Sequence, residues 1–120
     1  MKLDVNMYVR TKRDGIGKII SLSIGSEDEC CFIELSKRRT GIKEHNIIKA
    51  SRNIIDLIEV GDYVNGYPVY ETIEYPNNTR AIVIADDNKS IIWEESSQYI
   101  KSILTKEQFE SMKYEVKWNE

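Results

Sequence analysis

Apolar and polar residues alternate along the first three quarters of the chain. Up to about residue 94, apolar positions recur with a period near two, in short runs that Gly, Asp, Asn and Ser separate. This pattern is typical of antiparallel β-strands. It predicts strands at 5–11, 16–23, 30–36, 46–50, 62–66, 67–75, 80–85 and 90–94.

Two dipeptides mark predicted hairpins. Asp14-Gly15 lies between the first two strands, and Asn65-Gly66 lies between strands 62–66 and 67–75. A two-residue hairpin turn needs positive φ at both central positions, which Gly, Asn and Asp tolerate. We therefore expect a tight turn at each dipeptide.

The second of these turns sets the pairing of its strands. It places Val64 opposite Tyr67, and Tyr63 opposite Pro68. Because proline lacks an amide hydrogen, Pro68 predicts a free edge or a bulge on the other side of its strand.

Two segments depart from the strand pattern. Residues 51–60, "SRNIIDLIEV", fit one helical face about as well as a buried extended segment, and the shortness of the run favours a turn plus strand. Residues 105–113, "TKEQFESMK", predict a helix, because Thr105 can cap the first amides and Gln108 can complete a capping box. A further short helical segment is expected over 96–104.

The predicted fold class follows from this layout. A chain of 120 residues has the length of a single domain with one core. We expect a mainly β (α+β) protein, in which residues 1–94 form a small SH3-like or similar antiparallel β-barrel or twisted sheet. One or two short helices then form a helical C-terminal cap over 95–120.

The chain carries no pattern that specifies catalysis. There is no P-loop, metalloprotease helix or nucleophile elbow, so we expect no enzymatic activity, no catalytic residue and no cofactor. The adjacent Cys30 and Cys31, with the lone His45, are too few for a zinc site and are interpreted as packing residues. Asp86-Asp87 fits a hairpin loop better than a divalent metal site.

The sequence also predicts where the protein resides. It has no apolar stretch of eighteen residues and no apolar run of signal-peptide length near its start. We therefore expect a protein of the bacterial cytoplasm that makes no membrane contact.

Charge is distributed unevenly. Residues 1–50 carry ten Lys/Arg and seven Asp/Glu, a net +3, and residues 51–120 carry seven and thirteen, a net −6. Basic clusters near two predicted hairpins suggest a nucleic-acid surface, although a pI near 5.3 is low for a dedicated nucleic-acid binder. Its candidate residues are Arg10, Lys12, Arg13, Lys37, Arg38 and Arg39.

Aromatic and acidic residues of the second half suggest a protein interface instead. Tyrosine rings give a large contact area at a small entropic cost, and carboxylates attract basic partners. The candidate interface residues are Tyr63, Asn65, Tyr67, Tyr70, Glu71, Glu74, Tyr75, Asp86 and Asp87. Further acidic residues that would add complementary charge are Glu59, Asp62, Glu94 and Glu95.

Three stretches give the chain a likeness to known proteins. "YVRTKRDGIGKI", "NIIKASRNIIDLIEVGDYVNGYPV" and "IKSILTKEQFESMKYEV" together resemble a largely uncharacterised family of small phage and prophage accessory proteins of low-GC Gram-positive bacteria. Relatives usually continue "NGYKV" where this chain has Pro68. The resemblance implies a mobile-element accessory protein and supplies no catalytic residue.

Together these observations favour one function over two alternatives. The leading hypothesis is a non-enzymatic, anti-CRISPR-like counter-defence protein that binds a host defence protein or ribonucleoprotein, such as a CRISPR effector, and blocks its nucleic-acid-binding surface. The alternatives are an SH3-like nucleic-acid-binding regulator and a protein that sequesters a small nucleotide. A homodimer is compatible with each hypothesis.

Overall fold

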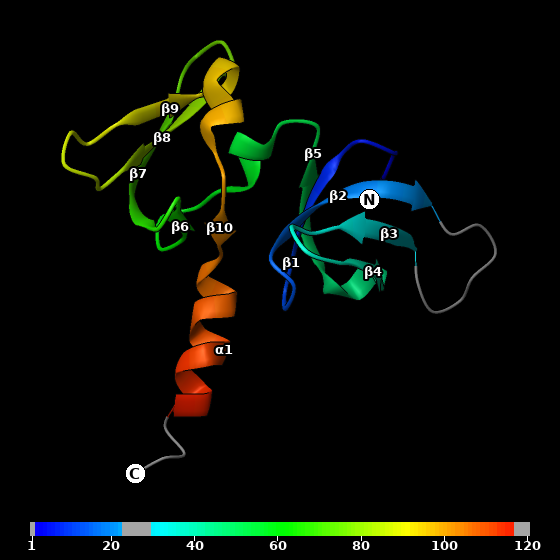
Figure 1. Ribbon diagram of the computed structural model, residues 1–120. Coiled ribbons are helices and arrows are strands. Elements are labelled where there is room, and N and C mark those ends of the chain that lie inside the picture. The colour runs from blue at the N-terminus through cyan, green and yellow to red at the C-terminus, as the bar shows by residue number, and fades with distance from the viewer. Residues whose placement is uncertain (1, 23–29, 117–120) are drawn as a thin grey trace.

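Two antiparallel five-stranded sheets followed by one α-helix make up the described part of the chain (Figure 1). The computed structural model describes residues 2–22 and 30–116. The first lobe, residues 2–51, has the strand order β4-β3-β2-β1-β5. Its strands are β1 (Tyr8–Thr11), β2 (Ile16–Leu22), β3 (Cys31–Glu34), β4 (Arg39–Ile42) and β5 (Ile47–Ser51), with the 3-10 turn η1 (Glu44–Asn46) before β5.

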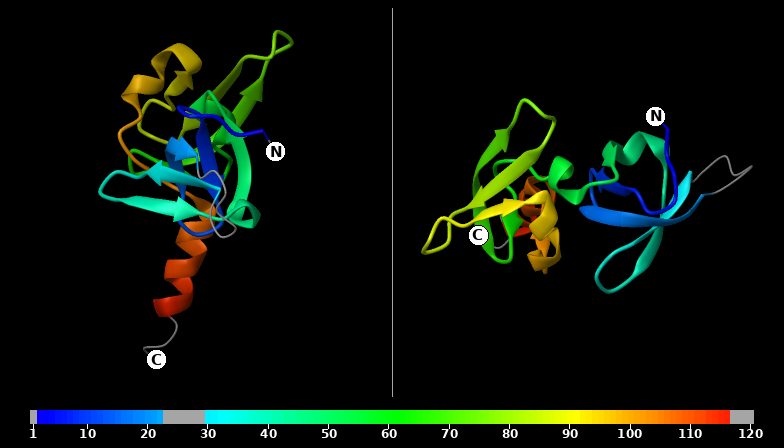
Figure 2. Two further views of the ribbon diagram at one scale, coloured as in Figure 1. Left: turned by 90° about the vertical axis from the view of Figure 1, so that its right-hand side faces the viewer. Right: turned by 90° about the horizontal axis from the view of Figure 1, so that it is seen from above.

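The second lobe, residues 52–104, has the strand order β10-β6-β7-β8-β9. Its strands are β6 (Tyr63–Val64), β7 (Tyr67–Glu74), β8 (Arg80–Ile84), β9 (Ile91–Trp93) and β10 (Ile103–Leu104). The 3-10 turn η2 (Ile54–Leu57) precedes β6, and the 3-10 turn η3 (Glu94–Tyr99) lies between β9 and β10 in the sequence. Helix α1 (Lys106–Val116) follows β10. Figure 2 shows the lobes side by side, and α1 extends away from both sheets.

The mainly β class predicted from the pattern is confirmed, but the barrel is wrong. Each sheet has an open order with two edge strands, β4 and β5 in the first and β10 and β9 in the second, so neither closes into a barrel. Strand β4 was also missed, since no strand was predicted between residues 36 and 46. Its pairing with β3 is regular, with Cys31 opposite Ile42 and Glu34 opposite Arg39.

The two predicted hairpins differ in outcome. The Asn65-Gly66 turn is confirmed, since both residues have positive φ, 54° and 84°. Its strands pair as expected, and β7 carries a register shift just after Pro68. The prediction of a two-residue turn at Asp14-Gly15 is wrong, because the turn is longer. The Thr11 amide donates to the carbonyl of Gly15 across the loop between them. Of Asp14 and Gly15, only Gly15 has positive φ.

The segments of uncertain type are now assigned. Residues 54–57 form a 3-10 turn rather than a strand, and its start is fixed by the Asn53 side chain, which accepts a hydrogen bond from the Ile55 amide. Only the first part of the helical segment expected at 96–104 is helical, because β10 begins at Ile103. The C-terminal helix is confirmed, although residues 117–120 of the expected cap lie outside the described residues.

The predicted capping box starts α1. The Gln108 amide donates to the Thr105 hydroxyl over 3.3 Å, and the Gln108 side chain accepts from the Thr105 amide over 3.0 Å. These reciprocal bonds satisfy amides that have no partner within the helix.

Each lobe has its own apolar core. The residues of the first cluster are Val9, Ile19, Cys31, Ile33, Ile42 and Ile47, and those of the second are Ile55, Ile58, Val64, Val69, Ile82, Ile84 and Ile92. Chain length predicted a single core, whereas the structure has one for each sheet. Ile16 of β2 packs against the second cluster and so joins the lobes by an apolar contact.

Candidate functional site

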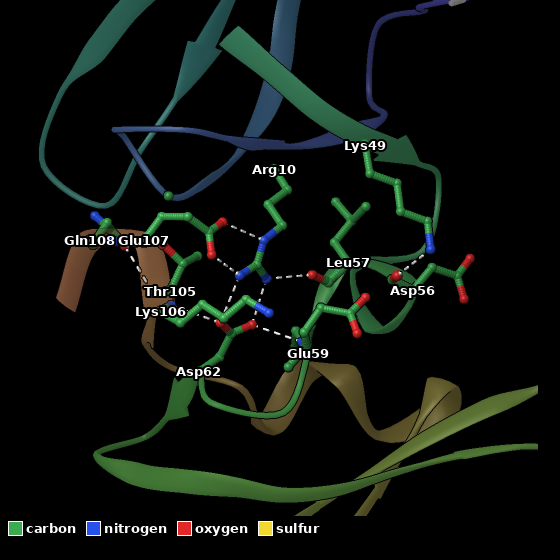
Figure 3. A network of polar contacts seen from close by, with 12 residues as sticks. Arg10, Lys49, Asp56, Leu57, Glu59, Asp62, Thr105, Lys106, Glu107 and Gln108 are labelled. Atoms are coloured by element: carbon green, nitrogen blue, oxygen red, sulfur yellow. Dashed lines mark hydrogen bonds and ion pairs between the residues drawn. The ribbon is translucent and has the colours of Figure 1, made fainter. Parts of the chain in front are cut away.

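A buried ion-pair network joins the two lobes (Figure 3). Arg10 of β1 is only 3% exposed, and both terminal nitrogens of its guanidinium donate to Asp62, over 2.5 Å and 2.7 Å. Its Nε and one terminal nitrogen donate to Glu107 of α1, each over 2.9 Å. A further bond of 2.8 Å reaches the Leu57 carbonyl. These bonds use all five N–H donors of the guanidinium.

Asp62 connects this network to the backbone on both sides. Its carboxylate accepts the amides of Glu59 and Lys106, each over 2.8 Å, and is completely buried. Lys106 opens α1, where a negative charge is favoured by the helix dipole. Burial alone would lower the pKa of Arg10, but its hydrogen bonds to the carboxylates of Asp62 and Glu107 raise that pKa above its ordinary value.

This network changes the interpretation of two predicted site residues. Arg10 cannot face nucleic acid in this structure, because its charge is buried and fully paired. Asp62 cannot add charge to a contact surface for the same reason. No local sequence pattern indicates this pair, because the two residues are 52 positions apart.

The remaining basic candidates lie on two loops of the first lobe. Lys12, Arg13 and Lys37 are exposed. Arg38 of the β3–β4 turn pairs with Asp14 of the β1–β2 loop over 2.6 Å, which brings the two basic clusters together. Arg39 pairs with Glu34 over 3.3 Å. Internal acids therefore offset part of the predicted basic surface.

The hairpin tip around Asn65 is occupied by internal contacts. The Asn65 side chain donates to the Tyr99 carbonyl and accepts the amides of Lys101 and Ser102, so it holds the segment that leads into β10. Tyr63 is half-buried and its ring lies 5.6 Å from that of Phe109. Tyr67 is 44% exposed. Asn65 and Tyr63 thus act mainly within the fold.

The strand register defines a second, outward side of the β7–β8–β9 sheet. Thr72, Ile82 and Ile92 form one row across the three strands, and the two isoleucines belong to the core. Directly paired residues share a face, and neighbours along a strand point to opposite faces. The two adjacent rows therefore face away from the core. These rows are Ile73, Ala81 and Trp93, and Glu71, Val83 and Ile91.

We call this side the outer face, defined by Tyr70, Glu71, Ile73, Tyr75, Ala81, Val83, Ile91 and Trp93. Tyr75 stacks on Trp93 with ring centroids 5.2 Å apart. Tyr70, in the bulge of β7, is 58% exposed, and the Lys89 ammonium lies 5.4 Å from its ring. Ile91 is 46% exposed. Ala81 and Val83 are buried, so the accessible part of this face consists of the exposed Tyr70, Glu71 and Ile91 and the half-buried Ile73, Tyr75 and Trp93.

The inner side of the same sheet is covered. One terminal nitrogen of Arg80 donates to the carbonyls of Ile55 and Ile58, each over 2.7 Å, and so fixes η2 against the core side of β8. The closest neighbours of β8 are β7, β9 and η2. The inner face of β8 is therefore covered by η2.

Carboxylates lie around the outer face. Glu71 is on it and Asp87 is exposed in the β8–β9 turn, whereas Glu74 pairs directly with Arg80 and so belongs to the core side of the sheet. Asp86 accepts both the Ser90 hydroxyl, over 2.6 Å, and the Ser90 amide, over 2.8 Å, and these bonds hold the pKa of Asp86 below its usual value. Asp86 therefore stabilises the β8–β9 turn, as the loop interpretation predicted.

No metal-binding constellation is found among the side chains that the structure describes. No group of three or more His, Cys, Asp or Glu among these side chains could hold a metal ion. His45 lies exposed in η1, and Cys31 is buried in the first core beside Cys30. No helix among the described residues has the length and apolar character that crossing a membrane requires.

Comparisons with protein-family models, with curated proteins and with solved structures find no match to this chain. Function is therefore inferred from the outer face, the buried network and the distribution of charge.

Proposed function

We propose that this protein is a non-enzymatic binding module that docks a partner protein on its outer face. The observation that carries the proposal is the pair of apolar rows directed away from the core, with Tyr70 and Ile91 exposed and Trp93 half-buried. Tyrosine and tryptophan are enriched at the centres of protein interfaces, where they supply most of the binding energy. Three predicted interface residues, Tyr70, Glu71 and Tyr75, belong to this face.

Charge favours a basic partner. Residues 54–104 contain nine Asp/Glu and three Lys/Arg, so the net charge of this segment is 3 − 9 = −6. Such a field attracts a basic surface and accelerates association. A second copy would bring two acidic lobes together and be repelled. We therefore commit to a heterologous partner with a basic, partly apolar surface, of the kind that binds nucleic acid.

The resemblance to phage and prophage accessory proteins suggests what that partner is. A host defence protein whose basic channel binds nucleic acid would fit an acidic, aromatic surface and would be blocked by it. Inhibition of such a complex stays a prediction of the resemblance, and the binding face can be tested without it.

The test compares surface variants in one pull-down. Tagged protein is incubated with extract of a low-GC Gram-positive bacterium, and captured proteins are quantified for wild type and for the double variant Tyr70→Ala/Ile91→Ala. Truncation of residues at the centre of an interface costs roughly 2 kcal/mol or more, so we expect at least about a thirtyfold loss of affinity. The matched control is Phe32→Ala, which removes an aromatic ring 41% exposed on the first lobe.

Three results would contradict the proposal. One is capture of the same stoichiometric partner by the double variant and by wild type. Another is a partner with an acidic surface, and a third is self-association of the isolated protein that Tyr70→Ala abolishes. Circular dichroism of the double variant separates loss of binding from loss of fold.

The nucleic-acid alternative receives less support. Arg10 is buried, and Arg38 and Arg39 are paired with acids, so three of its six candidate residues have their charge offset within the fold. A gel shift at low salt that is lost when Lys12, Arg13 and Lys37 are neutralised would restore it.

A further inference from the structure

A cavity of about 370 Å³ lies where the two lobes meet. The first lobe contributes residues from the β1–β2 loop and the β3–β4 turn, and the second contributes η2, residues 100–103 and the start of α1. This volume is within the range of small-molecule sites, about 300–1,000 Å³. None of the residues that define the outer face lines it.

The cavity has an apolar wall. Its apolar side chains are Ile16, Leu35, Ile54, Ile100 and Ile103. All five are only partly buried, and the four isoleucines also pack against the core of the second lobe. A flat apolar or aromatic group would cover the surface that they leave exposed to water.

The polar part of the lining is cationic. Lys37, Arg38 and Lys101 line the cavity with a single acid, Asp14, so the charged side chains sum to +2. Asp14 is paired with Arg38 over 2.6 Å, and this pair leaves the two lysines as unneutralised charge at the cavity. Phosphate monoesters carry about −1.5 to −2 charges at pH 7, which matches this sum.

Neutral hydrogen-bonding groups accompany these charges. Ser36, Ser102 and Gln108 line the cavity as well. Hydroxyl groups and a guanidinium suit the several acceptor oxygens of a phosphate better than the two of a carboxylate. A second cavity, of about 250 Å³, is lined by Lys49 and Arg80 and by two acids, so its charges cancel.

We propose that the larger cavity binds an aromatic phosphate monoester of the size of a nucleoside monophosphate, with the phosphate at Lys37, Arg38 and Lys101 and the ring on the isoleucine wall. Because the two lobes supply the lining together, such a ligand would hold them in one relative orientation. This site is separate from the protein-binding face, and either can be correct without the other.

The test uses the full-length protein and defined probes. The four nucleoside 5′-monophosphates and p-nitrophenyl phosphate are compared with inorganic phosphate and with adenosine, by thermal shift and by titration calorimetry. A ligand that binds only the folded state raises Tm. We expect at least one aromatic phosphate to raise Tm by several degrees, and more than either phosphate or adenosine alone.

Matched variants locate the binding. The double variant Lys37→Gln/Lys101→Gln should weaken the best probe by about tenfold or more, since loss of a charged hydrogen bond costs roughly 1.5–3 kcal/mol. The control Lys12→Gln/Lys43→Gln removes the same charge from exposed lysines outside the cavity lining and should bind as wild type does.

Several outcomes would overturn the proposal. These are no shift with any of the five aromatic phosphates, an equal shift with inorganic phosphate, or unchanged affinity in the cavity variant. Tighter, steeply salt-dependent binding of a single-stranded oligonucleotide would also overturn it, in favour of a nucleic-acid surface.

Discussion

The two lobes have the same number of strands but differ in how they treat polar groups. The core cluster of the first lobe consists of aliphatic residues and Cys31, and its charged side chains are mostly on exposed strand faces and turns. In the second lobe, all five residues of β8 are buried, Arg80 included, and Asp62 is buried beside its core. On the outer face Ala81 and Val83 are buried but Tyr70 and Ile91 stay exposed to water, and these exposed apolar side chains make that face the better candidate for a partner.

The two buried arginines sharpen this contrast. Arg10 has all five donors bonded and links the lobes. Arg80 serves the second lobe alone, and its Nε lacks a hydrogen-bond acceptor, with a Glu74 oxygen 3.7 Å away. Because every donor of Arg10 has a partner, removal of one of its acids should lower the stability of the protein strongly. Such a change leaves a buried charge without its partner.

The largest effect is expected for Asp62→Ala. This change leaves the Arg10 charge buried with Glu107 as its remaining acid, and it removes the acceptor at the start of α1. Loss of one partner of a buried pair costs roughly 3–5 kcal/mol in the free energy of unfolding. Urea denaturation, followed by circular dichroism, measures this loss in the free energy of unfolding.

Its control is an ion pair of the same chemistry at the surface. Asp4 and Arg52 lie 2.8 Å apart with both side chains at least 60% exposed, so Asp4→Ala should leave the urea midpoint nearly unchanged. Asp62→Asn keeps the shape of the side chain and should therefore lower the urea midpoint less than Asp62→Ala does. Equal midpoints for Asp62→Ala and Asp4→Ala would show that the lobes do not depend on the network.

A smaller effect is expected at the capping box where α1 begins. Thr105→Ala removes the hydroxyl that accepts the Gln108 amide and should cost about 1 kcal/mol. Hydrogen exchange of the first amides of α1 should then accelerate, while amides of the first core keep their protection. The control is Ser111→Ala, at an exposed position in the same helix, which should not lower the stability of the protein.

A pH-dependent effect is expected for the cysteine of the first core. Burial, and then the neighbouring Cys30, raise the pKa of Cys31 from 9.0 to about 12. A group with a raised folded-state pKa contributes stability that is complete below its unfolded pKa and is lost as the pH rises. Wild type should therefore lose more stability than Cys31→Val between about pH 8 and about pH 10.5, as urea midpoints measure.

Labelling of the thiols provides a second measure of the same property. At about pH 8, the half-buried Cys30 should react with a thiol reagent before Cys31 does, and urea should remove the difference. Equal rates in the folded protein would mean that the first core opens readily, in contrast to the fully packed interior assigned to it.

Local patterns in the sequence were enough to predict most strands. Period-two alternation located eight of the strands to within a few residues, and the Asn65-Gly66 turn and the Thr105 cap were found from turn and cap chemistry. Strand β4 was missed because "RTGI" alternates weakly and Arg39 is exposed. Strand β10 was missed because two residues carry no period.

The buried network could not be predicted in the same way. Arg10 stands in the string "RTKR", in which every basic residue is a surface residue by composition alone. Its acids come from positions 62 and 107, and only the folded chain brings these to one point. The outer face was partly found, since its tyrosines were recognised, but Trp93 and Ile91 join them through a strand register that the sequence does not specify.

The separation between Arg10 and Glu107 has a consequence for synthesis. A ribosome makes Arg10 first and must add 97 more residues before Glu107 exists. The first sheet is complete in sequence at residue 51, so it can pair its strands while the Arg10 guanidinium is still in water. The final desolvation of that charge must wait for the start of α1, so the guanidinium of the nascent first lobe keeps water as its partner until the helix docks.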